Sequence, residues 1–409
     1  MPASCAVDAL LCASHNFAKA ETHLRIRYTK DHKGRFIKQA VVYTPDEHHI
    51  DPNKIDVEAI KVARRLESSG HSAYVVGGAV RDLLRGKRPK DFDIATDAPP
   101  NRIRKLFRNS RVIGKRFKLV HVFFRDQTIE VSTFRAEESE GFQNIFGVID
   151  EDVHRRDFTC NALYYSVSDQ TVLDYVDGVK DIRKGVLRPV IPLQRIFQED
   201  PVRMVRAVKY AVTNHLRIPF FVGLRIRKES GSLADISASR LTEEGFKIFG
   251  SGYCLEMMDQ LKRYRLFEYL FPSLDLEAAR RDIAALDEFV RNDGPVERRD
   301  MLIYLLADFV LTKSHASTAR RISSADAYQE AKDMLKPVTP ANRDVEKAVG
   351  HIIRSRKQYL DTGVMPRYKS RPGRDGGAAP HQGSGEGRGT RRRPRRRRNQ
   401  RGDDIRQEG

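Results

Sequence analysis

Residues 76–96 have the sequence VGGAVRDLLRGKRPKDFDIAT, and this stretch decides the fold. Gly77 and Gly78 stand between a strand pattern and a helix pattern, where a backbone without side chains can approach a phosphate closely. Asp91 and Asp93 lie two residues apart, so on a strand both carboxylates point to one face, with Cα atoms roughly 6–7 Å apart. A lone Asp-x-Asp pair is usually only solvated. Together with the glycines and the basic helix between them, the pair indicates a phosphate-transfer site with bound divalent ions.

A third carboxylate is expected further along the chain. Glu130 stands in TIEVSTF at 128–134, a strand pattern in which a charged residue among apolar neighbours suggests a catalytic role. Mg²⁺ prefers oxygen ligands and keeps several waters, which two or three carboxylates and a triphosphate can provide. We therefore expect Asp91 and Asp93 to ligate two Mg²⁺ ions, with Mn²⁺ as the alternative metal.

A second motif, RRDFTCNA, occupies 155–162. Two arginines beside an aspartate could hold a triphosphate and a ribose. A surface ion pair in front of a core strand is an equally simple interpretation of these residues.

A third motif, EDPVRMVR, occupies 199–206 and predicts a helix capped by Asp200, with Pro201 at the first helical position. Asp200, Arg203 and Arg206 are each three residues apart, so they lie along one flank of that helix. A carboxylate and a guanidinium held together would present an acceptor and a donor to the edge of a base, and Arg206 could reach a phosphate. The alternative is a helix that is simply well capped.

Outside these motifs, the sequence predicts a mixed first half and a helical second half. The segment 136–147 has turn residues and acidic charge and predicts a mobile loop. Strands are expected at 36–43, 72–76, 92–95, 111–113, 119–124, 128–134, 159–167 and 172–175. Helices are expected at 56–69, 79–84, 100–107, 201–213, 240–248, 253–264, 276–291, 301–313, 324–335 and 345–360.

The chain has 409 residues and a formal net charge of +19. Residues 370–409 contain 12 Arg against 5 Asp or Glu, a net of +7, so the other 369 residues still carry +12 (19 − 7). A basic body favours a polyanionic partner such as nucleic acid, with an inert basic surface as the alternative. The tail contains RRRPRRRR at 391–398, which would neutralise RNA phosphates or, alternatively, serve only solubility.

Several classes of protein are disfavoured. No apolar run approaches the roughly 18–20 residues that a membrane span needs. The four cysteines, at 5, 12, 160 and 254, have no zinc-binding spacing, and this pattern favours a reducing cytoplasm. The first residues predict a loose extension rather than a signal peptide.

Taken together, GGAVRDLLRGKRPKDFDIAT, RRDFTCNAL and EDPVRMVRA resemble the class II nucleotidyltransferase superfamily, which contains tRNA CCA-adding enzymes and bacterial poly(A) polymerases. The resemblance runs from about residue 50 to 272. It implies an α+β fold, with a polymerase-β-like nucleotidyltransferase head followed by an all-helical neck and body. The divisions expected are an irregular extension (1–47), the head (48–187), the neck with the base-binding helix (188–272), an RNA-binding body (273–370) and a disordered basic tail (371–409).

The resemblance also implies residue roles. Asp91 and Asp93 would hold the metal ions, and Asp200 and Arg203 would contact the incoming base without a template. The full set expected to bind the nucleotide is Gly77, Gly78, Arg81, Arg156, Asp157, Asn161, Asp200, Arg203 and Arg206.

Within the superfamily, VIGKRFKLVHV at 112–122, VYTPDEHHID at 42–51 and NIFGVIDED at 144–152 resemble the poly(A) polymerase branch. The function expected is AMP addition from ATP to RNA 3′ ends by a cytoplasmic monomer, linked to RNA decay machinery, with no membrane partner. Three alternatives stay open: a tRNA CCA-adding or A-adding enzyme, an inactive RNA-binding protein, and a small-molecule nucleotidyltransferase. The last fits the aspartate pair but not the basic surplus.

Overall fold

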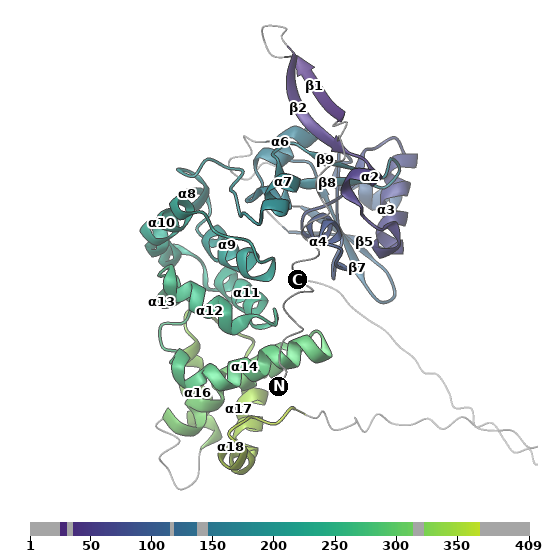
Figure 1. Cartoon of the computed structure of the whole chain (residues 1–409). Coiled ribbons are helices and arrows are strands. Elements are labelled where there is room, and N and C mark those ends of the chain that lie inside the picture. Colours follow the sequence, from purple (N-terminus) through teal and green to yellow (C-terminus); the bar gives the residue numbers. More distant parts are fainter. Residues whose placement is uncertain (1–24, 31–35, 115–117, 137–145, 314–322, 369–409) are drawn as a thin grey trace, which may run out of the picture. The chain divides into compact units, whose positions relative to one another are not determined.

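The fold is that of a computed structural model, which describes residues 25–30, 36–114, 118–136, 146–313 and 323–368. The predictions for the first 24 residues, for most of the loop at 136–147 and for the tail lie outside these residues. Figure 1 shows the described elements, with the sheet in the first half of the chain and helices throughout the second. The predicted order, a mixed α/β head and then helices, is confirmed.

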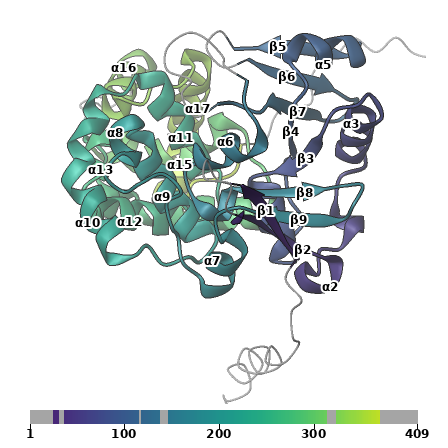
Figure 2. The same cartoon turned by 90° about the horizontal axis from the view of Figure 1, so that it is seen from above.

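The head contains a nine-stranded sheet with the order β1-β2-β9-β8-β3-β4-β7-β6-β5. Figure 2 shows the labels from β5 through β6, β7, β4, β3, β8 and β9 to β2 in this order. Most neighbours are antiparallel, but β4 and β7 are parallel and pair Asp93 with Glu130. The strands are β1 (Arg25–Lys30), β2 (Phe36–Tyr43), β3 (Ala73–Val76), β4 (Asp93–Thr96), β5 (Ser110–Ile113), β6 (Leu119–Phe123), β7 (Thr128–Thr133), β8 (Leu163–Ser166) and β9 (Thr171–Asp174).

The two faces of the sheet pack into different cores because successive side chains of a strand alternate. Val75 and Ile94 belong to the larger core, which helices α3 and α5 cover. Val76 and Ala95 belong to a smaller core on the opposite face, where Val153 of α6 packs. The head helices are α2 (Pro45–His48), α3 (Val57–Ser68), α4 (Gly78–Leu84), α5 (Pro100–Leu106), α6 (Ile149–His154) and α7 (Gly178–Lys184).

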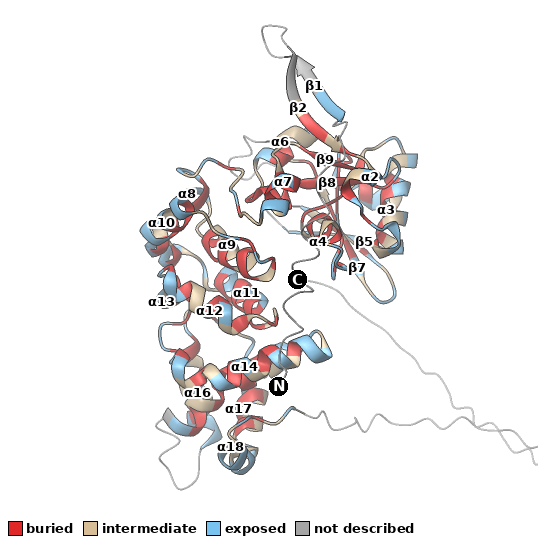
Figure 3. Ribbon diagram, viewed as in Figure 1, coloured by how far each residue is buried: buried red, intermediate tan, exposed pale blue. Residues whose placement is uncertain are grey.

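The second half is built from amphipathic helices. In α17, Val345, Ala348, Val349 and Ile352 are buried, a spacing that places them on one face. Figure 3 shows buried and exposed faces on these helices. They are α8 (Ile196–Glu199), α9 (Val202–Thr213), α10 (Phe220–Glu229), α11 (Ala238–Phe249), α12 (Cys254–Arg263), α13 (Phe267–Leu270), α14 (Leu276–Asp293), α15 (Arg298–Asp308), α16 (Ser324–Leu335), α17 (Asn342–Arg354) and α18 (Arg356–Thr362).

Several predicted elements are wrong in detail. The extension is not irregular throughout, because β1 pairs with β2 in a hairpin. The strand predicted from 159 begins instead as a short 3₁₀ helix, η3 (Thr159–Asn161), before β8. The helix predicted for 345–360 is two helices that meet at Ser355. Helix α10 was not predicted, since Gly223 weakens the helix pattern.

Close packing explains why a glycine stands at position 223 in α10. A Cβ atom at this position would lie 2.9 Å from Cε1 of Tyr264, too close for an ordinary contact. The glycine therefore lets α10 approach Tyr264 closely.

Candidate active site

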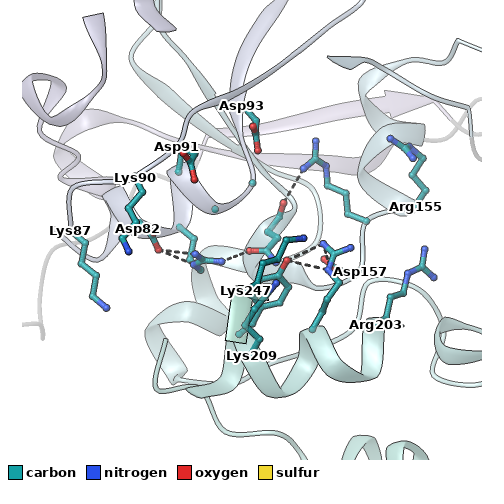
Figure 4. Close-up of a pocket in the computed structure, with 18 of the residues that line it drawn as sticks. Asp82, Lys87, Lys90, Asp91, Asp93, Arg155, Asp157, Arg203, Lys209 and Lys247 are labelled. Atoms are coloured by element: carbon teal, nitrogen blue, oxygen red, sulfur yellow. Dashed lines mark hydrogen bonds and ion pairs between the residues drawn. The ribbon is translucent and has the colours of Figure 1, made fainter. Parts of the chain in front are cut away.

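A cleft of about 930 Å³ opens between the head and helices α9 and α11. Figure 4 shows its side chains, which converge from α4, the segment before β4, the region after α6, and α9. Its lining contains eleven lysines and arginines against five aspartates, a formal surplus of six positive charges (11 − 5). The cleft is therefore suited to a ligand with several negative charges.

The structure gathers most of the predicted site residues in this cleft. Glu130 is the exception, because it does not line the cavity. The predicted residues that line it are Gly77, Gly78, Arg81, Asp91, Asp93, Arg156, Asp157, Asn161, Asp200, Arg203 and Arg206.

The carboxylate pair lies at the start of β4. Asp93 is the first residue of the strand, and Asp91 precedes it, so the two are not both on the strand as expected. The alternation nevertheless holds, since Phe92 and Ile94 are buried while Asp91 and Asp93 are exposed to the cleft. Glu130 lies beside Asp93 on the parallel strand β7, and its Oε2 is 3.5 Å from Nε2 of His121.

The electrostatics of this pair favour a cation. The pKa of Asp93 is raised to about 6, mainly because surrounding protein replaces water around its carboxyl group. Glu130 and Asp91 add like charge, which raises the pKa further, while Arg156 opposes them. Within the described ranges, no group of three or more His, Cys, Asp and Glu side chains is arranged to hold a metal ion. The two aspartates still fit Mg²⁺, which accepts one or two carboxylates plus substrate phosphate oxygens and water.

Asn161 offers a hydrogen-bond donor to a ligand. The residue is 7% exposed and lines the cleft from η3. Its Oδ1 accepts a hydrogen bond of 2.6 Å from Nη1 of Arg81, which fixes the orientation of the amide. Its Nδ2 has no partner among the described residues, although a buried donor is ordinarily paired. Gly77 lies close by, with a φ of 69° that disfavours any residue with a side chain.

Asp157 connects the head to α9. Its Oδ2 lies 2.8 Å from Nη2 of Arg206, and its Oδ1 accepts from the backbone N–H of Phe158. Arg206 also donates to the Tyr210 hydroxyl at 2.9 Å. Burial opposes the charge on Arg206, but Asp157 and Tyr210 outweigh it, so the pKa of this guanidinium is raised.

Arg156 is held from behind the cleft. Its Nε donates to the Tyr164 hydroxyl at 2.8 Å, and its Nη2 donates to Oδ2 of Asp152 at 3.0 Å. Arg155 pairs with the other oxygen of Asp152 at 2.8 Å. The arginines therefore pair with Asp152 of α6, and not with Asp157 as their position in the motif suggested.

The expected pairing of Asp200 with Arg203 is wrong. Both oxygens of Asp200 accept from Nη2 of Arg240 in α11, at 2.9 and 2.8 Å. Arg203 instead donates to Glu199, at 3.1 Å, and to a backbone carbonyl. The predicted N-cap residue is also displaced by one position, because α9 begins at Val202 and Pro201 is its N-cap. Asp200 still accepts a hydrogen bond at Oδ1 from the backbone N–H of Val202, at 3.2 Å.

Several basic residues of the cleft were not predicted. Lys87, Arg88 and Lys90 stand in the quoted stretch, so their charge could have marked them. Lys209 lies one turn after Arg206 on the same flank of α9. Lys247 comes from α11 and gave no local indication.

Buried Glu244 holds two of these lysines. It accepts from Lys209 at 2.9 Å and from Lys247 at 2.8 Å.

Two parts of the chain match known protein domains. Residues 73–188 match the poly A polymerase head domain, and residues 224–277 match the domain described as a probable RNA and SrmB-binding site of polymerase A. Poly(A) polymerase I of Salmonella typhi is 46% identical over 245 residues, which are 56% of this chain and 53% of the relative. The CCA-adding enzyme of Bacillus subtilis is 36% identical over 223 residues, 54% of this chain and 56% of the relative. The chain spans about half the length of the curated relatives it matches.

A solved structure shares the fold over a longer part of the chain. The Bacillus stearothermophilus CCA-adding enzyme in complex with CTP is 26% identical and superposes with a TM-score of 0.56, covering 75% of this chain and 70% of that one. The predicted polymerase-β-like head with a helical neck and body is thus confirmed. Residues 73–188 and 224–277 thus match two domains of poly A polymerases, and the chain is similar to the poly(A) polymerases and CCA-adding enzymes of the nucleotidyltransferase superfamily.

Proposed function

We propose that this protein is a template-independent polynucleotide adenylyltransferase that transfers AMP from ATP to RNA 3′ ends and releases pyrophosphate. The observation that carries the proposal is the unpaired Nδ2 of Asn161 in a strongly basic cleft beside two aspartates. A buried donor without a partner is costly unless a ligand accepts from it. A ribose hydroxyl or phosphate oxygen of a nucleotide has the required chemistry.

The proposed nucleotide lies with its triphosphate toward the basic side chains. Lys87, Arg88 and Lys90 are exposed in the cleft, and their side chains have no hydrogen bond or ion pair with other described residues. They are therefore available to neutralise the phosphates. Arg156 and Arg206 are already held by Asp152 and Asp157, so they contribute fixed positive charge rather than mobile contacts.

Asp91 and Asp93 are the residues proposed to hold Mg²⁺ or Mn²⁺. When bound, such ions favour deprotonation of a 3′ hydroxyl and stabilise negative charge on phosphate oxygens. The fixed charge of Arg156 and the charges of the exposed lysines would act on the same oxygens. Glu130 lies next to Asp93 on β7 and contacts His121 of β6, so it would add negative charge beside the proposed metal ligands.

The base would reach Asp200 and Arg203 at the α9 end of the cleft. Because Arg240 and Glu199 occupy these two groups, reading of a base requires them to share or exchange partners. Identity of 46% to a poly(A) polymerase, against 36% to a CCA-adding enzyme, supports adenylate addition.

The alternative proposal is a CCA-adding or A-adding tRNA enzyme, which the likeness to CCA-adding enzymes supports. One experiment separates the two functions. Purified protein with Mg²⁺ receives either a generic end-labelled RNA or a tRNA without its CCA end, with ATP, CTP or both. A long ladder on the generic RNA with ATP alone is expected. Addition that stops after C-C-A on tRNA alone would identify the alternative, and no ATP consumption would indicate an inactive RNA-binding protein.

The setting proposed is the cytoplasm, with a monomer that acts with RNA decay machinery. Among the described residues, no helix has the length and apolar character needed to cross a membrane. Size-exclusion chromatography with light scattering tests the monomer, and co-purification tests the decay partners.

A further inference from the structure

A second cavity, of about 590 Å³, lies on the flank of α9 opposite the cleft. Arg206 and Tyr210 of α9 face the cleft, whereas Val208, Ala211 and Val212 line this second groove. These two sets lie on opposite sides of the helix because each residue rotates by about 100°. The other walls come from the segment 214–219, the start of α10, and α12.

The groove continues onto an exposed face of α10 that we call the α10 face. It consists of Phe220, Phe221, Leu224, Arg227 and Lys228. Phe220 is 75% exposed and Phe221 71% exposed, and their rings meet edge to face with centroids 5.5 Å apart. Two large aromatic side chains left open side by side are a feature of binding surfaces.

The same surface carries cations without protein partners. The side chains of Arg217, Arg227 and Lys228 are exposed and form no hydrogen bond or ion pair with any other residue that the structure describes. Arg263, in the groove wall, lies over the ring of Tyr264 at 5.8 Å. Glu256 is the acidic residue of the groove lining. The surface therefore combines open aromatic faces with a surplus of positive charge.

We propose that the α10 face and its groove bind single-stranded RNA upstream of the 3′ end held in the cleft. Bases would stack on Phe220 and Phe221, and phosphates would contact Arg217, Arg227 and Lys228. Aromatic rings beside cations bind single strands in this way because every base has a π face and every nucleotide a charge. This inference rests on the proposed function, because it requires an RNA substrate. Phe220, Phe221 and Arg217 lie outside the segment 224–277 that matches the RNA-binding domain.

The α10 face is separated from the cleft by α9, about 10 Å across. A short primer occupies the cleft alone, whereas a longer strand passes around α9 and reaches Phe220. The contribution of the α10 face therefore depends on RNA length.

A tryptophan reporter tests the stacking directly, since the chain contains no tryptophan. In the Phe220→Trp variant, addition of oligo(A) of about 20 nucleotides should quench the fluorescence, because a stacked base quenches the indole it covers. A Val57→Trp variant is the matched control, since Val57 is 62% exposed on α3 of the head. Unchanged fluorescence in the Phe220→Trp variant would overturn the proposal.

Affinity measurements provide the second test. The double variant Phe220→Ala/Phe221→Ala should bind long oligo(A) about 5- to 30-fold more weakly, the loss expected for one stacked base. Both side chains are exposed, so thermal stability should stay unchanged, and the affinity for a short primer should stay unchanged as well. The Arg217→Gln variant should make the negative slope of log K against log salt shallower by about 0.7, because one phosphate is no longer neutralised. The control variant Arg64→Gln on α3 should leave the slope unchanged.

These binding assays need neither ATP nor catalysis, so they can contradict the RNA-binding proposal without contradicting the proposed function. Suppose that the protein adds AMP to a short primer, but that replacing Phe220 and Phe221 leaves its affinity for long RNA unchanged. This result contradicts the RNA-binding proposal alone. In that case the α10 face serves a protein or a membrane surface. A chain that binds long RNA through the α10 face but incorporates no nucleotide contradicts the proposed function alone.

Discussion

Asp93 is held in an environment that opposes its own charge. Glu130 and Asp91 stand next to it, and its pKa of about 6 reflects the protein that surrounds the carboxyl group and then their repulsion. Replacing this carboxylate by an amide removes the repulsion, so the Asp93→Asn protein should be at least as stable as the wild type at neutral pH. Stability given up for a charged cluster is typical of a functional site.

Nucleotide incorporation by Asp93→Asn should nevertheless fall at least about 100-fold, because the proposed metal ions lose a ligand. Thermal unfolding and incorporation of labelled AMP are measured on the same preparation. Asp97→Asn is the control, since Asp97 follows the same strand but contacts His71 at 3.0 Å outside the cleft. Retained incorporation by Asp93→Asn would remove Asp93 from the metal site.

Asn161 allows a test of a single donor atom. Asn161→Asp keeps an oxygen for Arg81 and replaces the unpaired Nδ2 with an acceptor that repels a nucleotide oxygen. We expect the KM for ATP to rise by about tenfold or more, the effect of one lost hydrogen bond plus repulsion. Turnover at saturating ATP should change less. An unchanged KM, measured in steady-state assays, would mean that the donor does not face the nucleotide.

At the scale of elements, helix α6 supports the cleft from behind through Asp152. This carboxylate is 2% exposed and accepts from Arg155, Arg156 and the Tyr164 hydroxyl. Burial alone would raise its pKa, but the two guanidiniums and the hydroxyl lower it to about 2. The network thereby fixes α6 and β8 around Arg156.

The lowered pKa of Asp152 predicts a pH-dependent contribution to stability. Since the folded pKa lies below the unfolded value of 3.8, the contribution is complete above pH 4 and is lost as the pH falls toward 2. Asp152→Asn should reduce the free energy of unfolding by about 2–3 kcal/mol at pH 7. Urea unfolding across this pH range measures the loss of stability, with Asp150→Asn on the same helix as a partly exposed control. A constant difference between pH 7 and 2.5 would contradict this account.

Local patterns predicted the elements that carry the site. The glycine pair at the start of α4 and the Asp-x-Asp at the start of β4 depend on conformations within a few residues, so the sequence determines them directly. The spacing of apolar residues likewise predicted α9, α11, α12 and α14. Helix α10 was missed because Gly223 weakens the helix pattern and because its exposed face mixes Phe220, Phe221 and Leu224 with charged residues, so periodicity does not separate an apolar from a polar face.

Partners that come from far along the chain could not be predicted. Arg240 reaches Asp200 from 40 residues away, and Lys247 enters the cleft because Glu244 also binds Lys209. Neither contact has a local pattern. The expectation that Asp200 would pair with Arg203 followed from helix spacing alone, and Arg240 takes both of the carboxylate oxygens instead.

For the whole molecule, positive charge is divided between residues 1–369, with a net of +12, and the tail. The cleft lining has a surplus of six positive charges, whereas residues 370–409 add a net of +7 by sequence. In the proposed function, the cleft would bind the 3′ end and the triphosphate at fixed positions. The arginines of the tail are proposed to neutralise RNA phosphates, a contribution that does not depend on the RNA sequence.

A chain that ends after Tyr368 separates these two contributions. Residues up to Arg367 belong to one compact unit, so the truncated protein should unfold at the same temperature as the full chain. Its affinity for long RNA should fall. The negative slope of log K against log salt should become shallower by about 0.7 for each phosphate that the tail no longer neutralises. Addition of AMP to a saturating short primer should persist, because the cleft residues are all retained. Fluorescence anisotropy at several salt concentrations measures the slope, and an unchanged slope would show that the arginines at 391–398 do not bind RNA. Loss of addition to the short primer would instead indicate that the tail contributes to the active site.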